Sequence, residues 1–290
     1  MPTMSAAPTL ATEPLDEPVF VTAPERDTAT RLRHAIADLR ASLALWRLGT
    51  TLAWTDIKGR YRGSILGPFW VTASTAVMIA ALGILYAALF GQSLTDYLPF
   101  LTLSLVLWGY LSTVTTEACS CFSGAESAIR ARRTPFLLLV GRIVLRNVIV
   151  LGHNVLVVVV VFALFGVHPG LTALWCLPGL VLWLLDSIAI TVLLGTLGAR
   201  FRDIPPIVGS LLQIAFFISP VIWKPELIPH AKTWMRFNPF YSLLDVIREP
   251  LLDHAVPPVV WGLACVYSAL LCLGAAALFL RVRCRLAYWV

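Results

Sequence analysis

The sequence predicts an all-α integral membrane protein with six transmembrane helices, an N-terminal amphipathic interface helix and two short re-entrant helices between the fifth and sixth spans. Two properties of the chain predict this fold class. First, 58% of its 290 residues are hydrophobic and only 13% are charged, whereas a soluble domain carries about 25% charged residues. Second, its Lys and Arg residues gather in alternate connections between long apolar stretches. A chain with so little polar surface is expected in a lipid bilayer.

The N-terminal part of the chain is expected to stay on the cytoplasmic side. Residues 1–26 are rich in Pro, Ala and Thr and lack the basic and apolar regions of a cleaved signal peptide, so they are predicted to form a disordered cytoplasmic tail. Residues 27–63 are predicted to form an amphipathic interface helix followed by a basic approach to the membrane. The apolar stripe of this helix consists of Leu32, Ile36, Leu39 and Leu43. Such a helix is expected to lie flat on the cytoplasmic leaflet, although a soluble helix packed on a partner is an alternative.

Residues 64–290 are expected to form a six-span transmembrane domain. About 20 apolar residues are needed to cross about 30 Å of hydrocarbon at about 1.5 Å per residue, and six stretches are long enough. These are residues 65–90, 97–116, 147–167, 171–199, 204–223 and 255–280. Of the 22 Lys and Arg residues, 18 lie on one side of these spans and four on the other. Because Lys and Arg remain in the cytoplasm, both termini are predicted to be cytoplasmic.

A basic stretch precedes the first span. In the segment WTDIKGRYRGSILGPFW, from Trp54 to Trp70, three cations follow Asp56 at short intervals: Lys58, Arg60 and Arg62. Basic residues at this depth meet anionic headgroups and phosphates, so they are candidates to receive an anionic, lipid-linked substrate. An anchor that only fixes the topology is an equally good interpretation.

The connection between the fifth and sixth spans is unusually apolar. Residues 224–254 contain aromatic and aliphatic side chains that a solvated loop would not need, and Asn238-Pro239 is typical of a helix start. This pattern predicts two short helices that dip into the outer leaflet and pack against the rest of the protein, since irregular backbone at that depth requires protein around it. An amphipathic surface hairpin is the alternative.

Motifs of catalysis and of cofactor binding are not found. The sequence has no P-loop, no nucleophile elbow, no zinc-protease motif and no metal-ligand spacing, so neither catalytic nor metal residues nor a cofactor are predicted, and without a basic tail nucleic acid is not an expected partner. Asp186 is the one acid within a span, and a hydrogen-bonded structural role is favoured over a proton relay. Glu126 to Pro135 forms a short cytoplasmic segment that could dock a soluble partner or simply be a solvated loop.

Five segments together resemble the permease subunits of type-2 ABC exporters, in the style of the polysaccharide and O-antigen export family. They are WTDIKGRYRGSILGPFW, SAIRARRTPFLLLVGRIVLRN, RFRDIPPIVGSLLQIAFFISPVIW, NPFYSLLDVIREPLL and RCRLAYWV. They occur in the family's order on a six-span hydropathy profile, and the resemblance covers the chain from about Leu32 to its C-terminus.

The resemblance implies a function and partners. The chain would be a non-enzymatic permease of the bacterial inner membrane that forms a homodimer and binds a separate P-loop ATPase, which holds the ATP. It would move an O-antigen-like polysaccharide, linked to a polyprenyl diphosphate, outward across the membrane.

The resemblance also implies roles for particular residues. Lys58, Arg60 and Arg62 would meet the lipid diphosphate. Trp70, Trp108 and Tyr110 would line the sugar path, although plain packing explains these aromatic residues as well. The ATPase would dock on Glu126, Ile129, Arg130, Arg132 and Arg133. The outer gate would consist of Trp234, Phe240, Tyr241, Leu244 and Ile247.

Other functions remain open at this point. The same kind of exporter could carry teichoic acid, a capsular polysaccharide, a lipid or a drug. A membrane-embedded enzyme or a proton-coupled carrier would need more intramembrane titratable groups than Asp186, and a structural scaffold would not need the basic stretch before the first span.

Overall fold

The computed structural model describes residues 28–60, 62–63, 67, 69–131 and 134–290, and every regular element in this part of the chain is a helix. The predicted all-α class is therefore confirmed. The predicted tail, residues 1–26, and two of the predicted docking residues, Arg132 and Arg133, lie outside the described residues.

Five helical segments are long and apolar enough to cross a membrane. They are α3 (Phe69–Leu89), α4 (Leu94–Ala118), α6 (Phe136–Phe165), the continuous stretch of η2 (Leu171–Trp175) and α7 (Cys176–Arg200), and α11 (Pro258–Trp289). Local signals set their ends. The Ser93 side chain accepts a hydrogen bond from the Asp96 amide at the start of α4, and Gly166 takes a left-handed conformation (φ 67°) that ends α6.

The predicted fifth span is only partly helical. Helix α8 (Ile204–Ile218) has 15 residues, which extend over only about 22 Å at 1.5 Å per residue. It ends where Ser219 turns to an extended conformation (ψ 147°). Ser219 precedes Pro220, and the ring of a proline disfavours the helical conformation of the residue before it. The structure thus has five long spans and one shorter apolar helix among the described residues.

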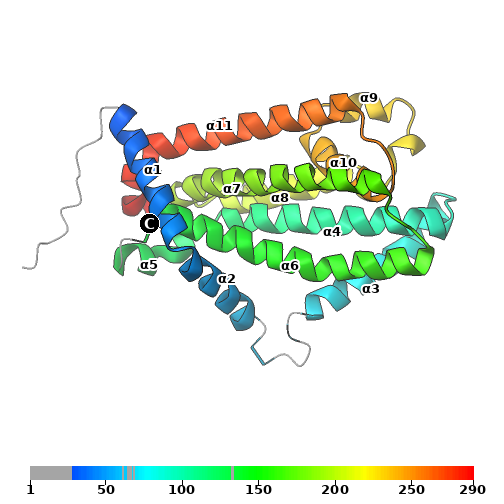
Figure 1. Ribbon diagram of the computed structural model, residues 1–290, viewed down its shortest axis with the longest axis horizontal. Helices are drawn as coiled ribbons and strands as arrows, with labels where there is room; N and C mark the ends of the chain where they lie inside the picture. Colours follow the sequence, from blue (N-terminus) through cyan, green and yellow to red (C-terminus); the bar gives the residue numbers. More distant parts are fainter. Residues whose placement is uncertain (1–27, 61, 64–66, 68, 132–133) are drawn as a thin grey trace, which may run out of the picture.

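The N-terminal amphipathic segment forms two helices instead of one, α1 (Thr28–Ala44) and α2 (Trp46–Arg60), which meet at an angle (Figure 1). The apolar stripe faces away from the protein, since Leu32, Ile36, Leu39 and Leu43 are all exposed. The polar side chain of Asp38 is instead turned inward and is only 5% exposed. This orientation leaves an apolar surface on the outside of the molecule, as a helix on a lipid surface requires.

The helices form an elongated bundle with two distinct ends (Figure 1). Helix α1, the short helix α5 (Glu126–Ala131) and the chain's C-terminus gather at one end, which we call the α5 end. At the other, the α10 end, lie the turn between α3 and α4 and the helices α9 (Ala231–Met235) and α10 (Pro239–Leu251). Both ends of the described chain therefore lie at the α5 end.

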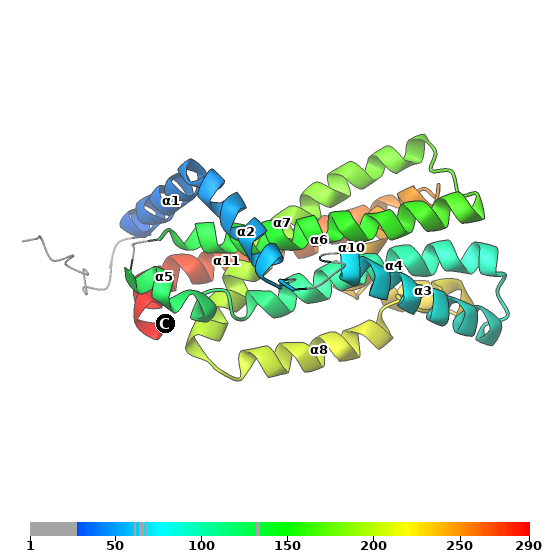
Figure 2. The same cartoon turned by 90° about the horizontal axis from the view of Figure 1, so that it is seen from below.

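Helix α4 forms the centre of the bundle. Most of its side chains from Tyr97 to Leu111 are buried, and it packs against α3, α6, α7, α8 and α10. Helix α8 lies on the outside of this arrangement (Figure 2), and only Leu212 of its side chains is buried. An apolar helix with so little of its surface covered has most of its side chains available for lipid or another protein.

Two short helices occupy the connection before α11, as the sequence predicted. Asn238 caps α10 by accepting a hydrogen bond from the Phe240 amide at 2.9 Å, which confirms the predicted helix start. Helix α10 packs against α4, α7 and α11, so it belongs to the bundle and is not a separate surface hairpin.

Candidate functional site

A group of charged residues joins three helices near the α5 end. It consists of Asp56 and Arg60 on α2, Glu117 on α4, and Arg142 and Arg146 on α6, and we call it the charged cluster. Arg142 binds Asp56 with two hydrogen bonds, through Nε at 2.7 Å and Nη2 at 2.5 Å. Arg146 lies between the two acids and donates to Asp56 at 3.0 Å and to Glu117 at 2.6 Å. Bidentate guanidinium–carboxylate pairs fix orientation as well as distance.

Glu117 lies at the C-terminal end of α4, where the helix dipole disfavours a negative charge. Three donors compensate for this position: Arg60, Arg146 and Asn147 each approach a Glu117 carboxylate oxygen at 2.6 Å. The cluster therefore links the amphipathic helix α2 to α4 and α6 of the bundle.

The electrostatic environment keeps Asp56 charged. Burial alone would raise the pKa of Asp56, but the hydrogen bonds and positive charges of Arg142 and Arg146 outweigh it and lower that pKa below its usual value. At neutral pH the Asp56 carboxylate is thus ionised and holds α2 against α6.

The three cations predicted to meet a lipid diphosphate occupy different surroundings. Arg60 belongs to the charged cluster. Lys58 is exposed and its ammonium lies 5.7 Å from the centre of the Trp54 ring, and Arg62 is exposed in the connection to α3. The structure brings Arg60 together with Arg142 and Arg146, which the sequence analysis counted only as topology-setting charges.

A second polar junction ties α1 to the bundle. The carboxylate of Asp38 accepts hydrogen bonds from the backbone amides of Phe136 (3.2 Å) and Leu137 (3.0 Å), at the N-terminus of α6. Arg283 of α11 also donates to Asp38, at 3.2 Å. Asp38 therefore caps α6 from a distant part of the chain, and this contact lies directly after the predicted docking segment.

The described part of the docking segment is divided between surface and interior. Glu126 is exposed at the start of α5, and Arg130 lies in the same helix. Ile129, in contrast, is packed in the hydrophobic core and is 8% exposed. In this conformation the Ile129 side chain anchors α5 to the bundle instead of facing a partner.

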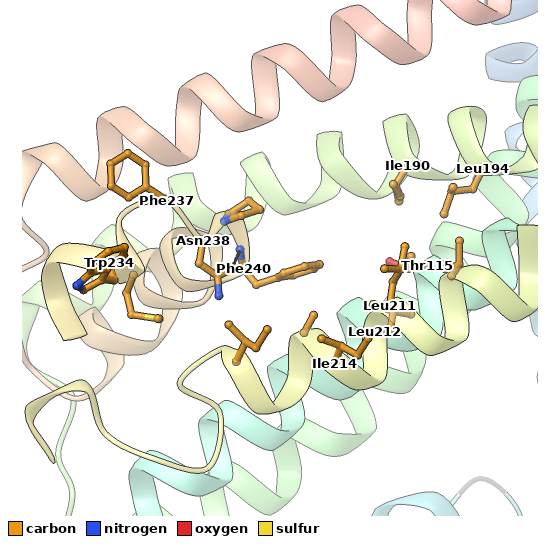
Figure 3. A pocket seen from close by; sticks show the side chains of 15 residues that line it. Thr115, Ile190, Leu194, Leu211, Leu212, Ile214, Trp234, Phe237, Asn238 and Phe240 are labelled. Carbon is orange, nitrogen blue, oxygen red and sulfur yellow. Dashed lines mark hydrogen bonds between the residues drawn. The ribbon is translucent and has the colours of Figure 1, made fainter. Parts of the chain in front are cut away.

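An apolar groove of about 720 Å³ runs along α8 (Figure 3). Helices α4 and α7 line it at one end through Thr115, Ile190 and Leu194, and the segment from Trp234 to Phe240 lines it at the other. Leu211 and Leu212 of α8 lie along one side of the groove (Figure 3). A cavity this large with an almost wholly hydrocarbon lining suits an apolar chain or an apolar protein surface.

The three residues predicted for a sugar path do not lie together. Trp70 is exposed at the start of α3. Trp108 is buried, with its ring 5.3 Å from that of Phe240 and 5.7 Å from that of Phe216. Tyr110 is also buried: it stacks on Trp183 at 5.6 Å and its hydroxyl is hydrogen bonded to that of Ser187. In this conformation Trp108 and Tyr110 pack the core, and a common sugar-binding surface with Trp70 is not formed.

The predicted outer-gate residues divide into two groups. Tyr241, Leu244 and Ile247 of α10 are buried against the bundle, and Phe240 is partly buried. Trp234 of α9 is 73% exposed at the end of the groove. The firmly packed part is thus α10, whereas α9 presents its tryptophan at the surface.

Arg248 is a residue whose importance the sequence analysis missed. It is fully buried on α10, where it forms an ion pair with Asp245 and donates to the Ser104 hydroxyl (2.9 Å) and the Pro220 carbonyl (2.7 Å). Its guanidinium also lies 4.3 Å from the centre of the Phe100 ring. One side chain therefore joins α10, α4 and the turn after α8. A cation within such an apolar segment is the signal that could have identified it.

Asp186 is buried within α7, and its Oδ2 accepts a hydrogen bond from Ser268 of α11 at 2.7 Å. This contact connects the two helices that pack most extensively against each other and agrees with a structural role. Among the described residues, no three His, Cys, Asp or Glu side chains are grouped closely enough to hold a metal ion.

Comparisons with known proteins point to one family. The sequence profile of a family described as ABC-2 type transporter matches residues 48–252. An "O-antigen export system permease protein RfbA" from Klebsiella pneumoniae is 24% identical over 238 residues, which cover 80% of this chain and 90% of the relative. A protein of the same name from Myxococcus xanthus is 24% identical and covers 71% of this chain and 81% of the relative.

Proposed function

The chain belongs to the ABC-2 type transporter family, and on this premise we propose that it is the transmembrane subunit of an ATP-driven exporter of a lipid-linked polysaccharide. The substrate would resemble O antigen on a polyprenyl diphosphate, and transport would run outward across the inner membrane. The observation that carries this proposal is the similarity to two O-antigen export permeases, which extends over 80% or more of the relatives' length.

The proposed topology has six crossings. Helix α8 would make the fifth, together with the residues that follow it up to Trp223, because its 15 residues alone are shorter than the hydrocarbon layer. Helices α9 and α10 would re-enter the outer leaflet, where the packing of α10 against α4, α7 and α11 satisfies the need for surrounding protein. The α5 end would then face the cytoplasm with both termini.

The transport path would form between two copies of the chain. Five large apolar side chains of α8 are exposed, and the groove beside this helix is open to a partner surface, which supports a homodimer. In such a dimer Trp70, Trp108 and Tyr110 could line the sugar path only if α4 and its neighbours repack during transport, since two of them are buried in the described state. Trp234, which is the exposed residue of the predicted outer gate, would serve as its moving part.

Energy would come from a separate P-loop ATPase that docks at the α5 end. Glu126, Arg130, Arg132 and Arg133 would contact it, and Ile129 would hold α5 in place. The junction of Asp38 with the start of α6 and with Arg283 supports this arrangement, because it would pass a displacement of α5 to both α1 and α11.

Copurification tests the ATPase contact. A candidate P-loop ATPase is co-expressed with the tagged chain, and its yield is compared among the wild type, Glu126→Arg and Arg130→Glu. We expect both reversals of charge to weaken the complex by at least tenfold. The control variant Arg236→Glu, which changes a residue near the α10 end, should leave the complex intact. A complex that withstands both α5 variants would contradict the docking role of α5.

A further inference from the structure

A polar cavity of about 260 Å³ lies beside the charged cluster, between the end of α4, the following turn and α6. Its polar lining includes Arg60, Glu117, Ser120, Arg142 and Arg146. The volume is several times the roughly 30 Å³ that a water molecule occupies in the liquid, so it is large enough for a small polyatomic ion or a lipid headgroup fragment.

The charges around this cavity are unequal. Three guanidinium groups line it against one carboxylate, Glu117, and the second carboxylate of the cluster, Asp56, is not part of the lining. With both acids counted, the three arginines leave the cluster with a net charge of +1. The Arg146 side chain is 15% exposed and that of Arg142 is 30% exposed. A net positive charge around a partly enclosed polar cavity favours an anion inside it.

The arginine atoms retain capacity for hydrogen bonds. Arg146 donates through Nη1 and Nη2 to the two acids, while its Nε is buried without a hydrogen-bond partner among the described residues. Arg60 contacts Glu117 through Nη2, and its side chain is 47% exposed, so a ligand can reach it from solvent. Guanidinium groups present planar sets of donors that suit tetrahedral phosphate oxygens.

We propose that this cavity is a binding site for a phosphate group, with Arg60, Arg142 and Arg146 as its ligands. The phosphate would belong to a lipid headgroup or to a soluble phosphate or diphosphate. The inference rests on the proposed function only where it makes the lipid-linked substrate the natural source of that phosphate, since binding itself requires neither the ATPase nor transport.

Binding can be measured with the purified chain in detergent. In one arm, the melting temperature is followed as inorganic diphosphate is added, with sodium chloride as the control at equal ionic strength. In the other, native mass spectrometry compares the retention of phosphatidic acid with that of phosphatidylcholine. We expect wild-type protein to be stabilised by diphosphate, because a ligand that binds only the folded state raises its stability, and to retain phosphatidic acid preferentially.

Variants locate the site. Arg142→Gln and Arg60→Gln should each weaken phosphate binding at least tenfold, equivalent to about 1.4 kcal/mol, whereas Arg40→Gln, with the same charge change on the exposed face of α1, should not. If Arg142→Gln fails to fold, Arg60→Gln carries the test, since that side chain is half exposed. Retention of the lipid alone identifies a headgroup site and stabilisation by diphosphate alone a soluble ligand. No response in either arm of the wild type, or equal losses in Arg60→Gln and Arg40→Gln, would overturn the inference.

Copurification with the ATPase separates this inference from the proposed function. A chain that binds the ATPase normally but no phosphate group would refute the site and leave the transporter proposal standing. A chain that binds phosphate but no ATPase would refute the transporter proposal and leave the phosphate site standing.

Discussion

At the scale of single residues, the most unusual feature is an arginine without solvent exposure. Arg248 satisfies its charge with Asp245 and bonds to two further elements. The sequence analysis counted it only as one of four cations on the outer side, because such a count treats every cation alike and cannot show which one turns inward. Ile129 gives the opposite case, since it lies in a basic segment and yet packs in the core.

Removing the Arg248 guanidinium should destabilise the protein strongly. We expect Arg248→Leu to lower the free energy of unfolding by about 3–5 kcal/mol, because Asp245 would be left buried without its counterion. Thermal unfolding of the purified protein in detergent measures this, with the exposed Arg236→Leu as the matched control. The double variant Asp245→Leu/Arg248→Leu should recover part of the loss. If Arg248→Leu and Arg236→Leu have the same melting temperature, the buried ion pair is not important for stability.

The cap formed by Asp38 makes a second residue-scale prediction. Asp38→Ala removes both acceptors at the start of α6, and losing a helix cap costs about 0.5–2 kcal/mol. Backbone amide hydrogen exchange should therefore accelerate at Phe136 and Leu137 and remain unchanged in the middle of α6. Asp203→Ala, a change of an exposed acid in the turn before α8, serves as control. Unchanged exchange at the two amides would show that the contact does not persist in solution.

At the scale of elements, sequence periodicity and composition predicted the type and approximate position of the long helices. The apolar stretches at 65–90 and 97–116 correspond to α3 and α4, and the predicted N-terminal amphipathic segment to α1 and α2. The boundaries were less accurate where long-range contacts decide them. The predicted third span began at Asn147, whereas helix α6 begins at Phe136. The prediction began too late because Arg142 and Arg146 look too polar for a span until their pairing with Asp56 and Glu117 is known.

Close packing between α7 and the end of α4 provides an element-scale prediction. A Cβ added at Gly198 would lie 2.0 Å from the carbonyl oxygen of Cys119, whereas one at Gly209 on α8 would meet no atom within 4 Å. We expect Gly198→Ala to lower the melting temperature clearly, because backbone must move. Gly209→Ala should leave it equal or slightly higher, since alanine favours a helix by about 1 kcal/mol over glycine.

Thermal unfolding of both glycine variants under identical conditions checks this prediction. Equal stability of the two would mean that α7 does not approach the end of α4 as closely as the structure describes.

At the scale of the whole molecule, the sequence predicted the membrane class because composition averages over every residue. The site could be predicted less well. Arg60 of α2 comes together with Arg142 and Arg146 of α6. More than 80 positions of sequence separate Arg60 from the other two, and no local pattern connects them. The same holds for the groove, which forms only when α8 and the segment after it are placed beside α4 and α7.

The direction of the chain through the membrane is a whole-molecule prediction. With α8 as a crossing, a reporter fused after Val290 should lie on the cytoplasmic side, and single cysteines at Gln92 and Glu226 should react with an impermeant reagent from outside. Five crossings would place the C-terminus and Gln92 on the same side of the membrane. Labelling in intact cells and in inverted vesicles distinguishes the two patterns.

The most direct test of the proposed function is export itself. A bacterium that lacks its own O-antigen permease is supplied with this chain and its ATPase partner, and the polysaccharide that reaches the cell surface is quantified. We predict that export is restored and that it requires an intact P-loop in the ATPase. If polysaccharide stays inside the cell while both proteins are present in the membrane as a complex, this chain does not carry an O-antigen-like polysaccharide.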